Sequence, residues 1–424
     1  MAVNYLRGLL QAKKANMERM EEAVPGAVYD PMQELLSEAA WDEWAVMDEV
    51  ARRADQVIGD PMDACLVVDE SSFAKQGKQS AGVARQWDGR RGKVDNCQVG
   101  VFVSLANGQH VTPLYARLFL PKEWTGNRAR MRKVRVPKEY QKAKSKPRIA
   151  RDLLERCRAQ KVRYGWISAD GLYGNCPELL WSIAETGDTF MFHVHRDQRV
   201  FIEEPEPDKP AKRGRRGREP RWRTREPGQR IDALFADLPA GAWQRVQVRD
   251  ATRGQLELLA SSQLVWLFDT RTGRRERWHA VATRDPDSGE ERFALSNAPD
   301  TTPLPRLVFM LGQRYWVERA FQNGKSSVGM AEYQARGWHS WHRHMTFVAM
   351  ALLFMLEMRL TKKDTLPLLS CEDIKEVLAH ILPDRRATEA EILRQLQIRH
   401  RKRQLAMERA HKRQRAGMVD GRDV

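Results

Sequence analysis

Three carboxylates stand at positions where they could support phosphodiester chemistry. Asp69 and Asp170 each directly follow a short apolar segment, and Glu318 lies in the sequence LGQRYWVERAFQNGKSSVG. Phosphodiester hydrolysis needs an activated water and a stabilised leaving oxygen, and two Mg²⁺ ions about 3.5–4 Å apart supply both. Because Mg²⁺ prefers carboxylate oxygens, three Asp or Glu side chains are a sufficient ligand set. An aspartate after a strand is more often only a turn or capping residue, so the argument depends on the three together.

Two cations accompany Glu318. Arg314 precedes it by four residues and Lys325 follows it by seven. At 3.6 residues per turn, all three side chains would share one face of a helix. This spacing fits a metal ligand beside a bound phosphate. The alternative is a solvated face on which Arg314 merely pairs with Glu318.

The elements around the aspartates predict an α/β fold. Short apolar segments at 64–68 and 162–169 read as buried strands. Between them, Asn107-Gly108 separates two apolar segments at 98–105 and 110–119, which is a strong hairpin signal. After the hairpin come a helix, the strand at 162–169, a second helix and a last strand at 189–194. This is the order of elements in a ribonuclease-H-like core. In that core the first and fourth strands are neighbours, so Asp69 and Asp170 would meet at their carboxyl ends.

The rest of the chain divides around this core by composition and periodicity. We predict a ribonuclease-H-like catalytic core with an inserted small β-domain and flanking helical segments. The expected parts are an N-terminal helical, DNA-binding segment (1–60), the first part of the core (61–196), a basic loop and inserted β-domain (197–300), the second part of the core with the Glu318 helix (301–362), and a basic helical C-terminal segment (363–424). In the second part, residues 304–323 are expected to form one helix.

The net charge of +16, from 72 Lys and Arg against 56 Asp and Glu, favours a polyanionic partner. The basic segments 128–146, 209–230 and 399–415 are predicted to contact DNA backbone, the alternative being a solvated charge run. The charge alone also fits a basic soluble protein without a special partner. The five cysteines contain no C-x-x-C pair, which favours a reducing compartment and argues against a thiolate zinc site.

Other candidate groups are weaker. Glu70, Asp88 and Asp95 could be accessory carboxylates, although surface roles are the simpler interpretation. Three histidines, His339, His342 and His344, cluster in WHSWHRH, and helix packing or DNA contact is favoured over zinc because no cysteine accompanies them. The apolar run 345–355 is too short to span a bilayer and predicts a buried core helix. The P-loop pattern is missing from the sequence, so ATP use is not expected.

Together these motifs resemble a known family. The sequences VVDES, ADGLYG and R-x₃-E-x₆-K resemble those of the DDE transposases of bacterial insertion sequences, and the last is close to their Y-x₂-R-x₃-E-x₆-K signature. The stretches DESSFAKQGKQSAGVARQW and KVDNCQVGVFVSLANG are similar to the 701-type subgroup. One position departs from the signature: its tyrosine falls at Leu311, and Tyr315 is the nearby tyrosine.

The resemblance implies a specific activity. Asp69, Asp170 and Glu318 would bind two Mg²⁺ ions, which Mn²⁺ could replace, and Arg314 and Lys325 would hold a DNA phosphate. The enzyme would cut the terminal inverted repeats of an insertion sequence, form a hairpin through the freed 3′-OH, and join the ends to target DNA. It would act as a homodimer on double-stranded DNA in the bacterial cytoplasm, associated with the nucleoid. A nuclease of the same fold without strand transfer, and a non-catalytic DNA-binding descendant, are the alternatives.

Overall fold

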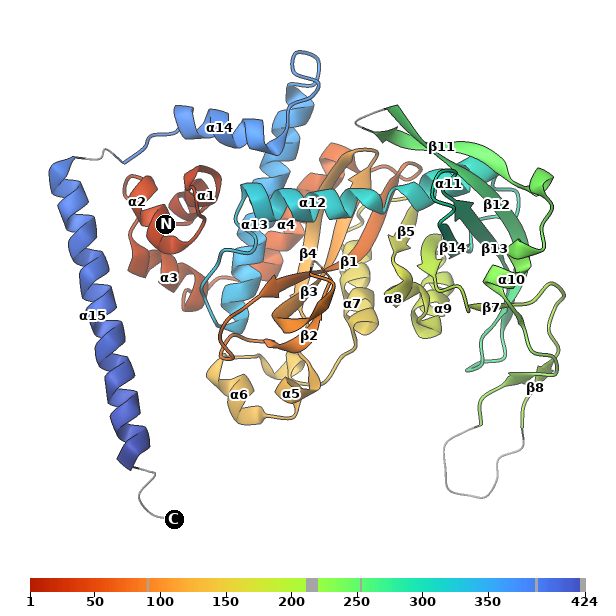
Figure 1. The fold of residues 1–424 in the computed structure, drawn as a ribbon, viewed down its shortest axis with the longest axis horizontal. Coiled ribbons are helices and arrows are strands. Elements are labelled where there is room, and N and C mark those ends of the chain that lie inside the picture. Colours follow the sequence, from red (N-terminus) through yellow and green to blue (C-terminus); the bar gives the residue numbers. More distant parts are fainter. Residues whose placement is uncertain (90, 211–219, 252–253, 386–387, 420–424) are drawn as a thin grey trace.

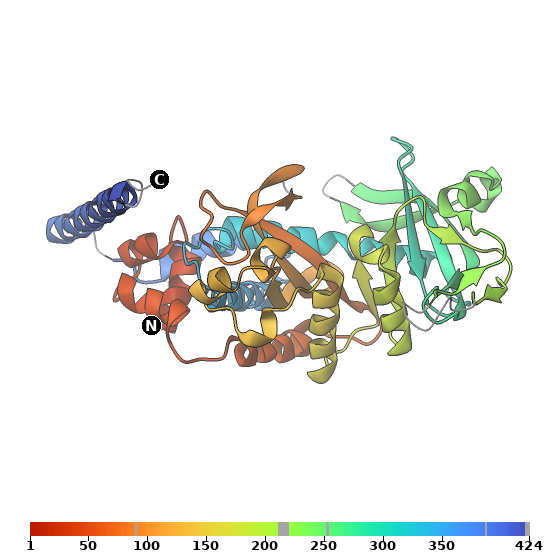
Figure 2. The same cartoon turned by 90° about the horizontal axis from the view of Figure 1, so that it is seen from below.

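The computed structural model describes residues 1–89, 91–210, 220–251, 254–385 and 388–419. Its parts follow one another along the long axis of the molecule (Figures 1 and 2). Helices from both ends of the chain lie at one end, a sheet with helices forms the middle, and long antiparallel strands form the other end. Part of the predicted basic loop, residues 211–219, lies outside the described residues.

The middle of the molecule has the predicted ribonuclease-H-like topology. Its strands are β1 (Ala64–Ala74), β3 (Lys93–Asn107), β4 (His110–Leu118), β5 (Trp166–Ala169) and β6 (Phe190–Val194). Their order is β4-β3-β1-β5-β6, with β1 antiparallel to β3 and parallel to β5. The expected neighbourhood of the first and fourth predicted strands, β1 and β5, is therefore confirmed. A further short strand, β2 (Ala84–Asp88), pairs with β3 and was not predicted.

The first strand is longer than its apolar segment. The prediction ended it before Asp69, whereas β1 continues to Ala74 because it keeps its antiparallel partner β3. The parallel pairing with β5 does end where expected, at Val68 opposite Ala169. Asp69 and Asp170 are the residues that directly follow the last paired residues, so they occupy equivalent positions at the end of the parallel pair.

The inserted strands extend the central sheet. They are β11 (Gln244–Ala251), β12 (Gly254–Phe268), β13 (Arg275–Arg284) and β14 (Glu291–Ser296), all antiparallel in this order. Because β14 also pairs with β6, one continuous sheet runs from the insertion into the core. The predicted inserted β-strands are thus joined edge to edge to the core through the pairing of β14 with β6. The strand β12 is long because Ser261 and Ser262 in its middle continue the ladder with β13.

Helices cover this sheet. They are α7 (Lys146–Ala159), α8 (Gly171–Gly174), α9 (Pro177–Glu185), α11 (Leu304–Gly312), α12 (Tyr315–Ser327) and α13 (Trp338–Thr361). Ser145 caps α7 by accepting a hydrogen bond from the Arg148 amide. Phe321 of α12 and Trp341 of α13 both pack on Phe102 of β3, which holds these two helices against the sheet.

The long apolar helix α13 is a core helix, as predicted from the run 345–355. It is long and apolar enough to cross a membrane by length and composition, but most of it is buried inside the protein. Its buried residues include Arg343, His342 and His344, whose polar atoms contact protein groups. Packing within the fold therefore accounts for its apolar character.

The predicted helix 304–323 is divided in two. Helix α11 ends at Gly312 and α12 begins at Tyr315, with Gln313 and Arg314 between them. The backbone of both linking residues stays in the right-handed helical region, with φ −66° and ψ −24° at Gln313 and φ −57° and ψ −31° at Arg314. The helical repeat is thus nearly preserved, and Arg314 still lies one turn before Glu318 as the spacing predicted.

The two ends of the chain are helical, as expected. The N-terminal helices are α1 (Ala2–Gln11), α2 (Met17–Ala23), α3 (Tyr29–Ser37) and α4 (Glu43–Ile58), and the C-terminal ones are α14 (Cys371–Ile381) and α15 (Glu389–Val419). Helix α4 contacts β3, β4 and α13, so it belongs to the core rather than to a separate segment. Helix α15 runs along the outside of α1–α3 (Figure 1), where Arg399 pairs with Glu22 at 3.1 Å.

Smaller elements complete the described chain. The short helix α5 (Lys122–Thr125) precedes the basic segment 128–146, which contains a second short helix, α6 (Arg128–Lys133), and a 3₁₀ turn (Lys138–Tyr140). Within the insertion lie α10 (Ile231–Ala236), a 3₁₀ turn (Ala240–Ala242) and four two-residue strands, β7 (Arg199–Val200), β8 (Pro207–Asp208), β9 (Arg223–Thr224) and β10 (Gln229–Arg230).

Candidate active site

The two aspartates lie side by side at the end of the parallel strand pair. Asp69 is on β1 and is almost fully buried, with 8% of its surface exposed. Its Oδ1 accepts a hydrogen bond of 2.7 Å from the Glu70 amide. Asp170 follows β5 and caps the short helix α8, because its side chain accepts a hydrogen bond of 3.0 Å from the Leu172 amide. The capping role that we considered as the alternative is thus real, but it leaves the second carboxylate oxygen available.

Arg314 connects Asp69 to Glu318. Its Nη1 lies 3.4 Å from Asp69 Oδ2, and its Nη2 donates to Glu318 Oε1 at 2.9 Å. The Glu318 side chain is 54% exposed and the Arg314 side chain 19%, so the pair lies at the mouth of the site. The pairing of Arg314 with Glu318 that we considered as the alternative is therefore present, and the same guanidinium also reaches the first aspartate.

The pKa of Asp69 depends on both of the other carboxylates. The pKa of Asp69 is raised to about 7, chiefly by burial; among its neighbours Arg314 lowers the pKa, whereas Asp170 and Glu318 raise it. A buried carboxylate beside two others disfavours its ionised form, because like charges repel in a medium of low polarity. Arg314 supplies only part of the positive charge that would stabilise the three ionised side chains.

The donor set fits a hard divalent cation. All three groups offer carboxylate oxygens, and their mutual repulsion would be relieved by positive charge between them. In the structure as it stands, none of the described residues forms a group of three His, Cys, Asp or Glu arranged to hold a metal. The Arg314 guanidinium supplies positive charge between Asp69 and Glu318. A metal ion shared by these two carboxylates would therefore replace the contacts that Arg314 now makes.

Lys325 lies farther along the same helix. Its Nζ is 5.6 Å from the centre of the Phe73 ring, and Phe73 is on β1 four residues beyond Asp69. Seven residues of helix separate Lys325 from Glu318, a distance of about 10 Å along the axis. The structure thus places Lys325 beside the path of β1 rather than among the carboxylates.

Three residues near Glu318 were not predicted from the sequence. His193 of β6, Arg249 of β11 and Arg292 of β14 line a cavity of about 150 Å³ together with Arg314 and Glu318. Burial, and then Arg314 and Arg292, lower the pKa of His193 to about 3, so this ring is neutral at physiological pH. The three residues carry no local motif, because only the continuous sheet brings β11 and β14 next to α12.

In this chain Leu311 occupies the position of the signature tyrosine. Leu311 is buried in the core with 7% of its surface exposed. Tyr315 opens α12 and packs under the guanidinium of Arg249, whose central carbon is 3.6 Å from the centre of the ring. Tyr315 lines the same cavity as Glu318, so its phenol is near the site although its spacing differs from the signature.

The accessory carboxylates have separate roles. Glu70 points to the opposite face of β1 from Asp69 and pairs with Lys146 at 2.8 Å. Asp88 is 2% exposed and accepts a hydrogen bond from Ser72, so the surface role expected for it is wrong. Asp95 is half-exposed and pairs with Arg91 at 2.6 Å, in line with the expectation.

The three histidines of α13 do not form a common site. His339 Nδ1 lies 2.6 Å from Glu43 Oε1, and His344 Nδ1 lies 2.8 Å from the Tyr5 hydroxyl. His342 donates through Nδ1 to the Trp338 carbonyl at 2.9 Å, while its Nε2 accepts from the Leu118 amide at 3.3 Å. Burial lowers the pKa of His342 and of His344, to about 4 and about 3. Each ring is fixed by a different partner, so helix packing rather than zinc binding explains the cluster.

Comparisons with known proteins define the class of this chain. The family model of the DDE superfamily endonucleases matches residues 1–255, which include Asp69 and Asp170. The chain therefore belongs to the DDE superfamily endonucleases, in agreement with its ribonuclease-H-like core. Nucleases of this superfamily generally use divalent metals.

One curated relative gives a more specific similarity than the family match. The chain is 23% identical over 274 residues to a protein of Microchaete diplosiphon named "Probable transposase for insertion sequence element IS701". The match covers 63% of this chain and spans 59% of the length of the relative. The similarity agrees with the 701-type resemblance of the sequence motifs.

Proposed function

We propose that this chain is a DNA transposase that catalyses metal-dependent cut-and-paste transposition of an insertion sequence. The observation that carries the proposal is the convergence of three carboxylates from distant parts of the chain. The pairing of β1 with β5 sets Asp69 beside Asp170, and Arg314 ties Asp69 to Glu318 of α12. Family membership and the similarity to a named transposase support the same conclusion.

Asp69, Asp170 and Glu318 are the residues that would hold the metal, two Mg²⁺ ions for which Mn²⁺ could substitute. When bound, such ions activate the attacking oxygen and stabilise the leaving oxygen of a phosphodiester. The protein holds two of the ligands rigidly, one within β1 and one at the cap of α8, whereas the exposed Glu318 completes the set from a helix. That division suits a site that is completed when DNA binds.

The two cations would position the DNA. A guanidinium can grip a phosphate through two parallel hydrogen bonds, so Arg314 could exchange its carboxylate contacts for a phosphate next to the cleaved bond. Lys325 would contact the same DNA strand as a point charge, at a position farther along β1. Hydrolysis of one phosphodiester at the element end would leave a 3′-OH and a 5′-phosphate. That 3′-OH would attack a phosphodiester of the opposite strand, giving a hairpin and releasing the 3′-OH of the flanking DNA. Water would reopen the hairpin, and the regenerated 3′-OH would attack a target phosphodiester and release a target 3′-OH.

The remaining parts of the proposal concern partners. The substrate would be double-stranded DNA, namely the terminal inverted repeats of the element and its target site. Two copies of the chain would pair the two ends in a synaptic complex. The protein would work in the bacterial cytoplasm, at the nucleoid.

Conservative variants of the three carboxylates test the proposal. Purified Asp69→Asn, Asp170→Asn and Glu318→Gln proteins should each bind a duplex carrying an element end but fail to cut it when Mg²⁺ is added. Asp95→Asn is the matched control, because it removes a partly exposed carboxylate that pairs with the surface cations Arg91 and Lys93. Cutting by any one of the three variants at the wild-type rate would remove that residue from the site.

An endonuclease without strand transfer is the second candidate, because the matching family is described as endonucleases. The two functions differ in the fate of the DNA ends after the first cut. A transposase should convert pre-cut element ends into products joined to a target plasmid, whereas a plain nuclease should only release free ends. Gel analysis of such a reaction separates them directly.

A further inference from the structure

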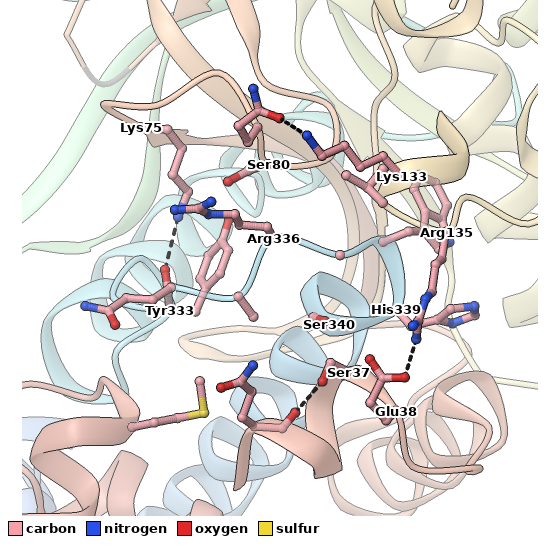
Figure 3. A pocket seen from close by; sticks show the side chains of 18 of the residues that line it. Ser37, Glu38, Lys75, Ser80, Lys133, Arg135, Tyr333, Arg336, His339 and Ser340 are labelled. Atoms are coloured by element: carbon pink, nitrogen blue, oxygen red, sulfur yellow. Dashed lines mark hydrogen bonds and ion pairs between the residues drawn. The ribbon is translucent and has the colours of Figure 1, made fainter. Parts of the chain in front are cut away.

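A large basic pocket lies between the N-terminal helices, the sheet and the C-terminal helix. It has a volume of about 1280 Å³ and is lined by Lys75, which directly follows β1 beyond Asp69. Figure 3 shows Lys75, Arg336 and Lys133 among the side chains that line it. Its walls come from α2 and α3, from the turn after β1, from α6, from the segment before α13, and from α15 through Arg409. The pocket is therefore assembled from segments that lie far apart in the sequence.

The lining is strongly cationic. It includes five Lys or Arg side chains, Lys75, Lys133, Arg135, Arg336 and Arg409, but a single carboxylate, that of Glu38. That carboxylate is paired with Arg135, and Lys133 donates to the Gln79 side chain at 3.2 Å.

Three of these cations lack an acidic partner among the residues that the structure describes. Within the described part of the chain, neither Lys75 nor Arg336 nor Arg409 is paired with a carboxylate. An uncompensated cluster of cations is costly in a partly enclosed space unless an anion joins it.

Lys75 is held in place by groups other than a carboxylate. Its Nζ donates to the Tyr333 carbonyl at 3.2 Å and lies 3.6 Å from the centre of the Tyr333 ring. Tyr333 is itself fixed, since its hydroxyl donates to Gln98 at 2.6 Å. Burial lowers the pKa of Lys75 to about 8, which leaves it mostly charged at neutral pH but poorly solvated. The same wall is tied together by the Ala81 amide, which donates to the Arg336 carbonyl at 2.9 Å.

The pocket lies in line with the candidate active site. Lys75 directly follows β1, six residues beyond Asp69, a distance of about 20 Å along the strand. Lys325 lies between them, beside Phe73. Cations thus follow β1 from the carboxylates to the pocket over a length that corresponds to about six base pairs of duplex.

We propose that this pocket binds the phosphate backbone of the same DNA duplex that enters the active site, about half a helical turn from the cleaved bond. The inference rests on the proposed function for the identity of the polyanion. Lys75 and Arg336 would contact phosphates from the core, and Arg409 would contact them from α15. The N-terminal helices and α15 would then serve as a clamp on DNA flanking the cut, rather than as separate recognition modules.

Salt-dependent binding tests the proposal. We suggest measuring fluorescence anisotropy of a labelled duplex of mixed sequence with the full-length protein and no divalent metal. Removal of one phosphate-binding cation should reduce the slope of log K against log[salt] by about 0.9, so the Lys75→Gln/Arg336→Gln protein should show a reduction of about 1.8. The Lys362→Gln/Lys363→Gln protein removes the same charge from an exposed turn outside the pocket and should keep a slope much closer to that of the wild type.

The choice of variants distinguishes a failure of this inference from a failure of the proposed function. If the Lys75 variant is unstable, Arg336→Gln/Arg409→Gln changes only exposed side chains and should give the same reduction. Equal slopes for pocket variants and wild type would overturn the inference even if the enzyme cuts DNA. A pocket-dependent slope in a protein that never cuts DNA would overturn the proposed function alone. Absence of duplex binding by the wild type would overturn both.

Discussion

Replacing Asp69 with Asn separates the electrostatics of the candidate site from its chemistry. The pKa of Asp69 rises from an ordinary value of 3.8 to about 7 in the folded protein, chiefly through burial. The folded state therefore holds the proton more tightly than the unfolded state. The resulting stability is fully present below about pH 4 and is lost as the pH rises through 7.

The size of the effect can be worked out from this pKa. One pKa unit corresponds to about 1.4 kcal/mol, so ionised Asp69 destabilises the folded protein by about 4 kcal/mol above pH 8. Asn cannot ionise, and its amide oxygen can still accept the hydrogen bond from the Glu70 amide. We expect Asp69→Asn to be as stable as wild type near pH 4 and more stable by up to about 4 kcal/mol at pH 8.

Urea unfolding followed by tryptophan fluorescence, at several pH values without divalent metal, measures this difference. Asp95→Asn is the control, because the pKa of Asp95 is lowered by its hydrogen bonds and its variant should show no gain at high pH. Added Mg²⁺ should then stabilise wild type but not Asp69→Asn, since a ligand that binds only the folded state raises its stability. A pH-independent difference between the two proteins would refute the electrostatic reasoning, and equal Mg²⁺ effects would refute the metal assignment.

Three further predictions concern neighbouring groups. Arg314→Ala should nick an element end near the wild-type rate but slow the later hairpin and opening steps, and time courses on labelled DNA would show whether it does. Gly174→Ala would place a Cβ 1.8 Å from the His193 carbonyl oxygen, so its urea midpoint should fall by the equivalent of about 1–3 kcal/mol, and an unchanged midpoint would contradict the close contact. Glu43→Gln leaves Arg343 buried without its charged partner at 3.4 Å and should cost about 3 kcal/mol in the same assay; an unchanged midpoint would mean that the backbone carbonyls around Arg343 satisfy its charge without Glu43.

The sequence predicted the catalytic core well because its signals are local. Apolar β-branched runs, the Asn107-Gly108 turn and the capped helices determine the order of elements, and the ribonuclease-H-like topology then follows from that order. The pairing of Arg314 with Glu318 could also be foreseen from the sequence, because their i,i+4 relation is kept across the break between the two helices.

The remaining features depend on contacts between distant segments. The join of β14 to β6 has no local signature, so the sequence predicted an inserted β-domain but not the pairing that makes it continuous with the core sheet. For the same reason His193 and Arg292 could not be linked to Glu318 before the sheet was known. The burial of Asp88 was missed because its partner, Ser72, belongs to another strand.

The continuous sheet has a consequence for solubility. Without the insertion, β6 would be the last strand of the core, and its backbone and the apolar residues Phe190 to Phe192 would form an open edge. Open edges invite pairing with other chains and aggregation. Here β14 covers that edge, and the outermost strand becomes β11, which carries Arg245 and Arg249 and contains a bulge between Gln247 and Arg249. Charge and irregularity are the features that discourage edge pairing, so removing 244–296 should make the remaining core aggregate.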